Sequence, residues 1–290
     1  MGAGTRRMTG QRPTVSIKRA AVLGSPIAHS LSPALHRAGY AALGLDDWRY
    51  DAIELTEDDL PDWLDARGPE WKGLSLTMPL KRTVLGLVDH VQPLARLVGG
   101  ANTVLFSPAG TVGANTDVYG IVAAIREAAG GREFRSASVL GGGATAASAL
   151  AALAEFELRE PRVYVRSTAR SRQMLEAAVR MGVSPQLRKL CEDAPPLGWP
   201  ADLTISTLPP HAADHLAQAT LELPPGAVLL DAAYEPWPSA LAIAWARAGG
   251  TVVSGRAMLL HQAAAQFQAM TGHAAPLAEM RAALGANGGQ

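Results

Sequence analysis

Three consecutive glycines follow an apolar segment and precede an alanine-rich one. Residues 137–140 read ASVL, and Gly141, Gly143 and Ala146 then fit the pattern G-x-G-x-x-A. In a strand–turn–helix unit the first glycine permits a tight turn, the second lets the backbone approach a diphosphate, and the small third residue allows close packing. The start of the helix faces the phosphates. The pattern favours dinucleotide binding over a purely structural turn, and the binding residues it predicts are Gly141, Gly142, Gly143 and Ala144.

The segment after the next apolar run bears on which dinucleotide would bind. Residues 162–166 read RVYVR, and an enzyme that uses NAD usually carries an acidic residue at the end of this strand. This chain instead has Arg166, Ser167, Thr168 and Arg170 there. Guanidinium groups bind a phosphate, often through two hydrogen bonds, whereas a carboxylate would repel it. The segment favours NADP over NAD, the alternative being that these arginines only solvate a loop.

Further candidates carry hydroxyl, ammonium and carboxylate groups. Ser30 and Ser32 stand just before a proline at a predicted helix start, where hydroxyl groups usually cap the helix. Lys81 and Asp117 could act as a proton donor and its partner, since reduction of a carbonyl group requires a proton for the developing alkoxide. Taken alone, however, Lys81 is more typical of a solvated loop and Asp117 of a helix N-cap. Residue type by itself therefore leaves the structural roles ahead of the catalytic ones.

Short strand-like runs alternate with helical segments along the chain. Strands are predicted near residues 20–23, 48–53, 72–77, 102–106, 137–140, 162–166, 203–206 and 227–231, and helices near residues 118–129, 145–156, 170–181 and 240–249. This alternation is typical of parallel α/β architecture, in which ligands bind at the ends of the strands. A β-rich region gives way to a helix near residues 115–117, so we expect a domain boundary there.

Composition restricts the classes of function. The chain has 290 residues, of which 48% are hydrophobic, and its 26 basic and 26 acidic side chains balance. The chain therefore has no net positive charge that would attract nucleic acid or an anionic membrane. No apolar run reaches the roughly 18 residues of a membrane span. The one cysteine, Cys191, permits no internal disulfide, fits a reducing compartment and is expected to be inert. The spacing of the histidines does not match that of metal ligands, so we expect no metal site. We expect residues 1–18 to form a disordered tail.

Six segments resemble, in order, the signatures of the shikimate dehydrogenase family. Residues 24–36 read GSPIAHSLSPALH, and residues 76–81 read LTMPLK. The other four are GANT at 100–103, GANTD at 113–117, DAAYEP at 231–236 and SGRAMLLHQA at 254–263. One such match could arise by chance, but six in the family's order around a glycine loop are strongly specific.

The resemblance implies an NADP-dependent dehydrogenase that interconverts 3-dehydroshikimate and shikimate in the cytoplasm, within chorismate and aromatic amino acid biosynthesis. It implies an N-terminal α/β substrate domain (19–116 with 253–290) and a Rossmann-like, doubly wound parallel-sheet NADP domain (117–252), with the active site between them. It also implies a monomer or homodimer that binds small molecules. The roles carried over are Lys81 and Asp117 as the catalytic pair, Ser30, Ser32, Thr77, Asn102, Tyr234 and Gln262 in substrate binding, and Gly255 near the nicotinamide.

Several positions depart from the family's usual pattern. Asn is frequent where Ser75 and Arg37 stand, Ala is common at Gly142, and the phosphate loop often reads N-R-T where residues 166–168 read RST. None of these changes removes a proposed catalytic group. A quinate or aminoshikimate dehydrogenase, and a non-catalytic dinucleotide or ligand sensor on the same fold, remain alternatives. The arginines argue against an NAD-preferring quinate enzyme, and the retained Lys81 and Asp117 argue against a sensor.

Overall fold

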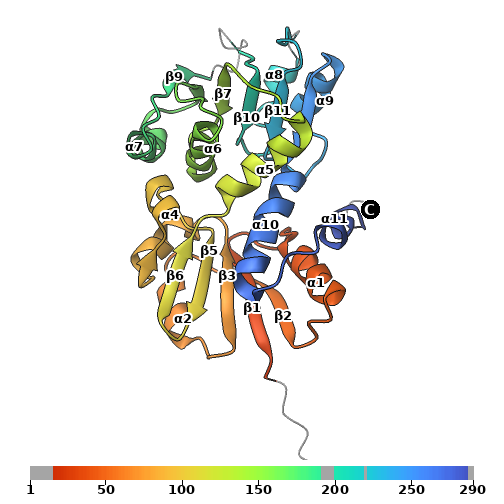
Figure 1. The fold of residues 1–290 in the computed structure, drawn as a ribbon. Helices are drawn as coiled ribbons and strands as arrows, with labels where there is room; N and C mark the ends of the chain where they lie inside the picture. The colour runs from red at the N-terminus through yellow and green to blue at the C-terminus, as the bar shows by residue number, and fades with distance from the viewer. Residues whose placement is uncertain (1–15, 191–198, 219–220, 287–290) are drawn as a thin grey trace, which may run out of the picture.

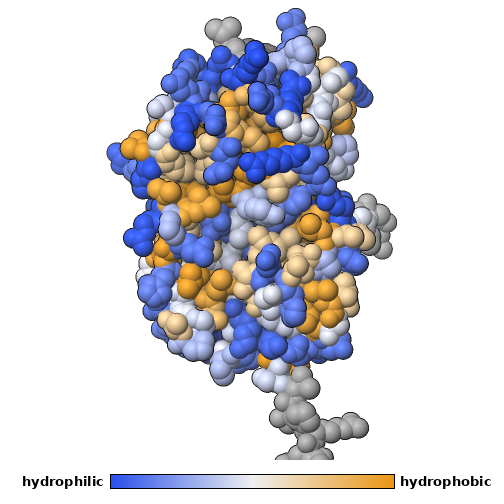
Figure 2. Space-filling model, viewed as in Figure 1, coloured by the Kyte–Doolittle hydropathy of each residue, from blue (hydrophilic) through white to orange (hydrophobic). Residues whose placement is uncertain are grey.

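The computed structural model describes residues 16–190, 199–218 and 221–286. Cys191 and the greater part of the predicted tail, residues 1–15, lie outside these ranges. The first strand begins at Lys18, one residue before the predicted start of the substrate domain. Within the described ranges, none of the helices combines the length and the apolar character needed to span a membrane. Figure 2 shows hydrophilic residues spread over this face of both halves of the molecule, with smaller hydrophobic patches between them.

The first half of the chain forms a six-stranded mixed sheet in the order β2-β1-β3-β5-β6-β4. Its parallel part consists of β1 (Lys18–Gly24), β2 (Trp48–Glu54) and β3 (Trp71–Leu76). The hairpin of β5 (Thr103–Ser107) and β6 (Gly110–Ala114) runs antiparallel beside β3, and the short β4 (His90–Val91) pairs with β6. The last five residues of β1 are buried because the strand has a neighbour on each side and helices over both faces.

Short helices cover this sheet: α1 (Ser32–Ala42), α2 (Leu60–Ala66), α3 (Leu80–Thr83), the 3₁₀ turn η1 (Val84–Gly86) and α4 (Pro93–Val98). Proline stands in the first turn of α1, α2 and α4, where its missing N–H has no partner to lose. One core cluster includes Leu74 and Leu80, and a second joins Leu35 and Tyr50 to Phe267 from the far end of the chain. The C-terminal part is thus built into the first half.

The second sheet is fully parallel and has the order β12-β11-β10-β7-β8-β9. Counted from β7, this is the 3-2-1-4-5-6 arrangement of doubly wound dinucleotide-binding folds, with the switch point between β7 and β10. The strands are β7 (Ala137–Leu140), β8 (Arg162–Val165), β9 (Gln186–Lys189), β10 (Leu203–Ser206), β11 (Val228–Asp231) and β12 (Thr251–Ser254). The intervening helices are α6 (Ala144–Ala154), η2 (Ala169–Ser171), α7 (Arg172–Arg180), α8 (Asp214–Ala217) and α9 (Ala240–Arg247).

Two helices cross between the halves (Figure 1). The chain leaves the first sheet through α5 (Asp117–Ala129) and returns from β12 through α10 (Gly255–Thr271), after which α11 (Leu277–Ala286) packs on α1. The crossing of α5 and α10 is close, because a Cβ atom on Gly120 would lie 2.7 Å from the carbonyl oxygen of Met258. The predicted return to the substrate domain at residue 253 falls inside β12, which remains in the second sheet to its end at Ser254. The crossing helices carry Asp117 and Gln262.

Candidate active site

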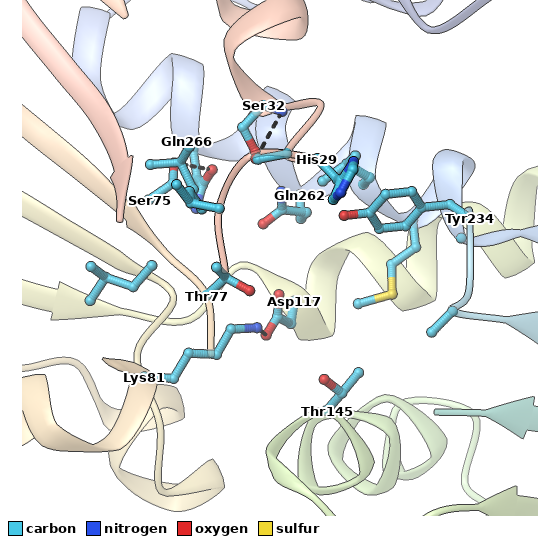
Figure 3. Close-up of a pocket in the computed structure, with 18 of the residues that line it drawn as sticks. His29, Ser32, Ser75, Thr77, Lys81, Asp117, Thr145, Tyr234, Gln262 and Gln266 are labelled. Atoms are coloured by element: carbon cyan, nitrogen blue, oxygen red, sulfur yellow. Dashed lines mark hydrogen bonds and ion pairs between the residues drawn. The ribbon is translucent and has the colours of Figure 1, made fainter. Parts of the chain in front are cut away.

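A cavity of about 280 Å³ lies between the two halves (Figure 3). Its walls come from the loop before α1, the end of β3, the starts of α3, α5 and α6, and the length of α10. Figure 3 shows the side chains of Lys81, Asp117 and Gln262 directed into the same space. The cavity thus brings together both predicted catalytic residues, Lys81 and Asp117, and the predicted cofactor-binding residue Gly255. It also contains five of the predicted substrate-binding residues: Ser30, Ser32, Thr77, Tyr234 and Gln262.

Lys81 and Asp117 form an ion pair inside this cavity. The Nζ atom of Lys81 lies 2.7 Å from Oδ2 of Asp117, and the two side chains are only 16% and 6% exposed. Lys81 is therefore not a solvated loop residue. Asp117 does not cap α5 either, because Thr116 occupies the N-cap position and no side-chain cap bond forms. The structural roles that residue type alone favoured do not describe this pair.

Asn102 lies behind the pair and fixes the other oxygen of the carboxylate. Its Nδ2 atom is 2.8 Å from Oδ1 of Asp117 and 2.8 Å from Oε1 of Gln262. Its own Oδ1 accepts a 2.8 Å hydrogen bond from the backbone N–H of Thr116. Asn102 is buried and does not line the cavity. It therefore holds the side chains of Asp117 and Gln262 in place from behind the cavity wall.

The local chain path explains why Lys81 points into the cavity. After β3 ends, the backbone N–H of Thr77 continues the sheet by donating to the carbonyl of Leu23, at 2.9 Å. The N–H of Leu80 then donates to the carbonyl of Thr77, also at 2.9 Å, which closes the turn. Leu80 is fully buried in the core below. With Leu80 anchored, the next residue on α3 is turned toward the space between the halves.

The hydroxyl groups of Ser30 and Ser32 are not used as helix caps. Leu31 occupies the N-cap position of α1, and no side-chain cap bond forms there. The Ser30 Oγ atom receives only a long contact, 3.4 Å, from the backbone N–H of Ser32.

Tyr234 reaches the cavity from the other half, and burial raises the pKa of its hydroxyl, with Glu235 adding to the effect. Its phenol therefore stays protonated as a hydrogen-bond donor at neutral pH.

A larger cavity, of about 800 Å³, opens beside the first and shares Thr77, Lys81 and Tyr234 with it. Its far wall is the glycine loop, at Gly143 and Ala144. Gly141 has a φ of +115°, and a Cβ atom there would lie 2.4 Å from Oγ1 of Thr207. A Cβ atom on Gly143 would meet nothing within 4 Å. The loop thus has the tight turn and the open approach that a dinucleotide diphosphate requires, and the residues fit such a cofactor.

The predicted phosphate-binding arginines are only partly gathered at this loop. Arg170 lines a groove of about 380 Å³ together with Gly142, Gly143 and Ala144. Arg166 and Thr168 are exposed, and neither they nor Ser167 lines this groove or the two cavities. The Ser167 carbonyl accepts a 3.0 Å hydrogen bond from Oγ of Ser171, which shapes the turn. Arg170 is therefore the predicted phosphate ligand that lies nearest the glycine loop.

The cavity also contains residues that sequence reasoning did not select as site residues. His29 and Thr145 line both the smaller and the larger cavity, and Ser75 and Gln266 line the smaller one. Gln266 follows Gln262 by four positions, so both side chains lie on one face of α10. The four-residue spacing is visible in the sequence and indicates that the two glutamines share a face of a helix. The sequence does not show that this face is the one that packs against β3 and the cavity.

A doubly wound sheet with an open glycine loop, facing a lysine–carboxylate pair across a cleft, defines a dinucleotide-dependent dehydrogenase. Residues 22–104 match the family model of the shikimate dehydrogenase substrate binding domain, and residues 255–284 match that of the shikimate 5′-dehydrogenase C-terminal domain. The NADP(+) shikimate dehydrogenase of Rubrobacter xylanophilus is 35% identical over 272 residues, which is 92% of this chain and 95% of that protein. The chain belongs to the shikimate dehydrogenase family.

Solved structures agree with this membership. The crystal structure of Mycobacterium tuberculosis shikimate dehydrogenase is 42% identical in sequence, has a TM-score of 0.81, and matches over 93% of this chain and 99% of that one. The shikimate 5-dehydrogenase of Thermus thermophilus, in complex with NADP(H) and shikimate, is 29% identical with a TM-score of 0.79 and the same coverage of both chains. The fold expected from the sequence, an α/β substrate half beside a Rossmann-like half, is confirmed.

Proposed function

We propose that this protein catalyses the reversible, NADPH-dependent reduction of 3-dehydroshikimate to shikimate. The observation that carries the proposal is the buried contact of 2.7 Å between Lys81 and Asp117, at the place where the smaller cavity meets the larger one. The smaller cavity suits a compact ring acid, and the larger one suits a dinucleotide. The relatives named NADP(+) shikimate dehydrogenase support both assignments.

The nicotinamide cofactor, when bound, supplies the hydride for the ring ketone. In this chain the Lys81 ammonium holds a proton at Nζ, close enough to the cavity to stabilise the developing alkoxide and to protonate it. Asp117 holds Lys81 in place through Oδ2, while Asn102 holds Oδ1. The carboxylate therefore has both oxygens fixed before substrate arrives, which limits the reorganisation that the reaction requires.

The substrate-binding roles follow the chemistry of the cavity wall. Ser30 and Ser32 present hydroxyl groups that are not used as caps, and we assign them to the substrate carboxylate. Thr77 and Gln262 are assigned to ring hydroxyls, with Asn102 supporting Gln262 from behind. Tyr234 contributes a protonated phenol from the other half. These polar groups converge in a mostly apolar cavity, which is the usual basis of orientation in small-molecule sites.

The cofactor-binding roles are assigned to the glycine loop and the arginine segment. Gly141, Gly142, Gly143 and Ala144 would accommodate the diphosphate, and Gly255 would lie near the nicotinamide. The 2′-phosphate is assigned to the segment that carries Arg166, Ser167, Thr168 and Arg170, with Arg170 the foremost of these because of its place beside the loop. We further propose that the enzyme serves aromatic amino acid biosynthesis through chorismate and works in the cytoplasm as a monomer or homodimer. We assign residues 19–116 and 253–290 to its substrate domain and residues 117–252 to its NADP domain.

A matrix of cofactors and substrates tests the proposal. Purified protein is mixed with NADP⁺ or NAD⁺ and with shikimate, quinate or aminoshikimate, and the absorbance of the reduced nicotinamide is followed. We expect the fastest turnover with NADP⁺ and shikimate. Turnover only with NAD⁺ and quinate would instead assign the chain to a quinate enzyme, and preference for aminoshikimate would assign it to that paralogue. Binding without turnover of any pair would favour a sensor.

A further inference from the structure

Arg82 extends from the first half of the molecule toward the second. It follows Lys81 on α3, and it lines both the larger cavity and the groove beyond the glycine loop. These two hollows have three lining residues in common: Arg82, Gly143 and Ala144. Arg82 therefore stands opposite the start of α6, across the gap between the halves.

The guanidinium group of Arg82 is available for a ligand. The side chain is exposed, and among residues 16–190, 199–218 and 221–286 no hydrogen bond or ion pair engages it. Arg180, in the same groove, differs in this respect, because its Nε atom donates to the carbonyl of Leu97 at 3.1 Å. Arg82 thus keeps a planar fork of N–H donors pointing into a cavity that suits an anionic cofactor.

The wall that faces Arg82 is suited to an anion as well. Gly143 precedes the eleven-residue helix α6 and offers no side-chain cap, so the first N–H groups of the helix remain open to a ligand. A Cβ atom on Gly143 would meet nothing within 4 Å. A doubly charged group placed there would meet helix N–H groups on one side and a guanidinium group on the other, and such charge-assisted contacts are among the stronger hydrogen bonds.

We infer that Arg82 binds the diphosphate of the dinucleotide from the substrate half, an assignment that rests on the proposed function. Because Arg82 and Lys81 are consecutive on α3, this contact would also hold the segment that carries the catalytic lysine against the nucleotide half. The diphosphate is favoured over the 2′-phosphate because Arg82 lines both hollows together with Gly143 and Ala144. Arg170, the foremost candidate for the 2′-phosphate, lines only the groove, and Arg166 and Thr168 line neither hollow.

Binding measurements on Arg82→Ala and Arg82→Lys test the assignment. The ligands are NADP⁺, NAD⁺, adenosine 2′-monophosphate, which lacks a diphosphate, and shikimate alone. For Arg82→Ala we expect the Kd values of NADP⁺ and NAD⁺ to rise by the same factor, about tenfold or more, since a charge-assisted contact is lost. The Kd values of adenosine 2′-monophosphate and shikimate should stay within about twofold, because neither ligand reaches Arg82. Arg82→Lys should recover part of the loss through its charge.

Arg135→Ala is the matched control. Arg135 is also exposed, but it stands two residues before β7, at the opposite end of the strand from the glycine loop, so dinucleotide affinity should not change. Unchanged affinity for both dinucleotides in Arg82→Ala would overturn the inference. A loss confined to NADP⁺ and adenosine 2′-monophosphate would place Arg82 on the 2′-phosphate and overturn it too. Failure of the unmodified protein to bind either dinucleotide would contradict the proposed function instead.

Discussion

The hydroxyl group of Ser75 donates a 2.7 Å hydrogen bond to the side-chain oxygen of Gln266, a residue 191 positions further along the chain. Ser75 in turn accepts a 2.6 Å hydrogen bond from the hydroxyl of Tyr50. The Gln266 amide nitrogen donates to the carbonyl of Asn102, at 2.9 Å, and to Oγ1 of Thr103, at 3.0 Å. This buried network ties β2, β3 and β5 to α10, so it fixes the helix that carries Gln262 against the sheet that leads to Lys81.

Gln266→Ala should destabilise the protein and loosen the site. The substitution leaves a cavity and removes the partner of buried polar groups on Ser75 and Thr103, which together predict a loss of about 2–5 kcal/mol in the free energy of unfolding. Denaturant unfolding of Gln266→Ala and of Gln268→Ala measures it, since Gln268 lies on the exposed side of the same helix. A loss no greater than that of the control would show that the network contributes little.

Lys81→Ala should lower kcat for shikimate oxidation by about 10²–10⁴ while affecting the Kd of shikimate far less, because general acid–base groups typically contribute that factor. Steady-state kinetics and direct binding separate the two effects. Lys72→Ala serves as the control, since its ammonium group donates to the carbonyl of Pro69, near the end of β3 that lies away from Lys81. A fall in kcat of less than about tenfold would contradict the proton-donor role of Lys81.

The elements that local sequence dictates were predictable. The strand, glycine turn and helix around residue 141 follow from an apolar run, three glycines and an alanine-rich segment, and the structure places β7 at Ala137–Leu140 and α6 at Ala144–Ala154. The strands β4, β6, β9 and β12 were not predicted. β6 contains two glycines in five residues, and β9 lies at a sheet edge where most of its residues are exposed. Three of the five residues of β6 are buried, but its glycines carry no side chain that would mark an apolar run. β9 lacks the apolar pattern because little of its surface is buried.

Site residues that lie in the family signatures could be predicted from the sequence. Those brought into the site only by the packing of distant segments could not. Ser75 was noted only as a departure from the family, and Gln266 was not singled out, because their contact exists only once α10 has returned to β3. Arg37, another departure, donates from Nε to the carbonyl of Tyr50 at 2.9 Å on the edge strand β2. Its role is thus to satisfy a backbone group that has no neighbouring strand.

Gly142→Ala should weaken NADP⁺ binding, even though alanine is common at this position in the family. A Cβ atom on Gly142 would lie 2.2 Å from Oγ and 2.9 Å from Cβ of Ser171, which is fully buried. Ser171 also donates to the carbonyl of Ser167, so displacing it moves the turn that carries Arg170. Overpacking of this kind typically costs about 1–3 kcal/mol, and we expect a roughly 5- to 150-fold rise in the Kd of NADP⁺.

The double variant Gly142→Ala with Ser171→Gly provides the matching test. Removing the Ser171 side chain relieves both close contacts, so the double variant should bind NADP⁺ more tightly than Gly142→Ala alone. Ser171→Gly alone reports the loss of the hydrogen bond to Ser167, and the four proteins together give the coupling between the two positions. Additive effects of the two substitutions would show that Ser171 is not the reason that this chain has glycine at position 142.

Stability should fall with acidification because of His36. Its ring is fully buried and stacks on Tyr50, with centroids 4.1 Å apart, and neither ring nitrogen is in hydrogen-bonding geometry with a described residue. Burial lowers the pKa of His36 from 6.5 to about 3, and nearby Gln266 opposes the shift only in part. Between pH 6.5 and about pH 3, His36 binds a proton in the unfolded chain but not in the folded protein. This group therefore favours unfolding increasingly as pH falls from 6.5 toward 3, and not above that range.

His36→Phe isolates that contribution, since phenylalanine retains an aromatic ring that can stack on Tyr50 but cannot be protonated. A proton excluded from the folded state costs roughly 1.4 kcal/mol per pH unit below the unfolded pKa, so the parent protein should lose about 2 kcal/mol more than His36→Phe between pH 7 and pH 5. Urea unfolding at both pH values measures the difference. His29→Phe is the control, because His29 is exposed whereas His36 is fully buried. Equal losses in the parent protein and His36→Phe would mean that His36 is protonated, or reaches solvent, in the folded protein.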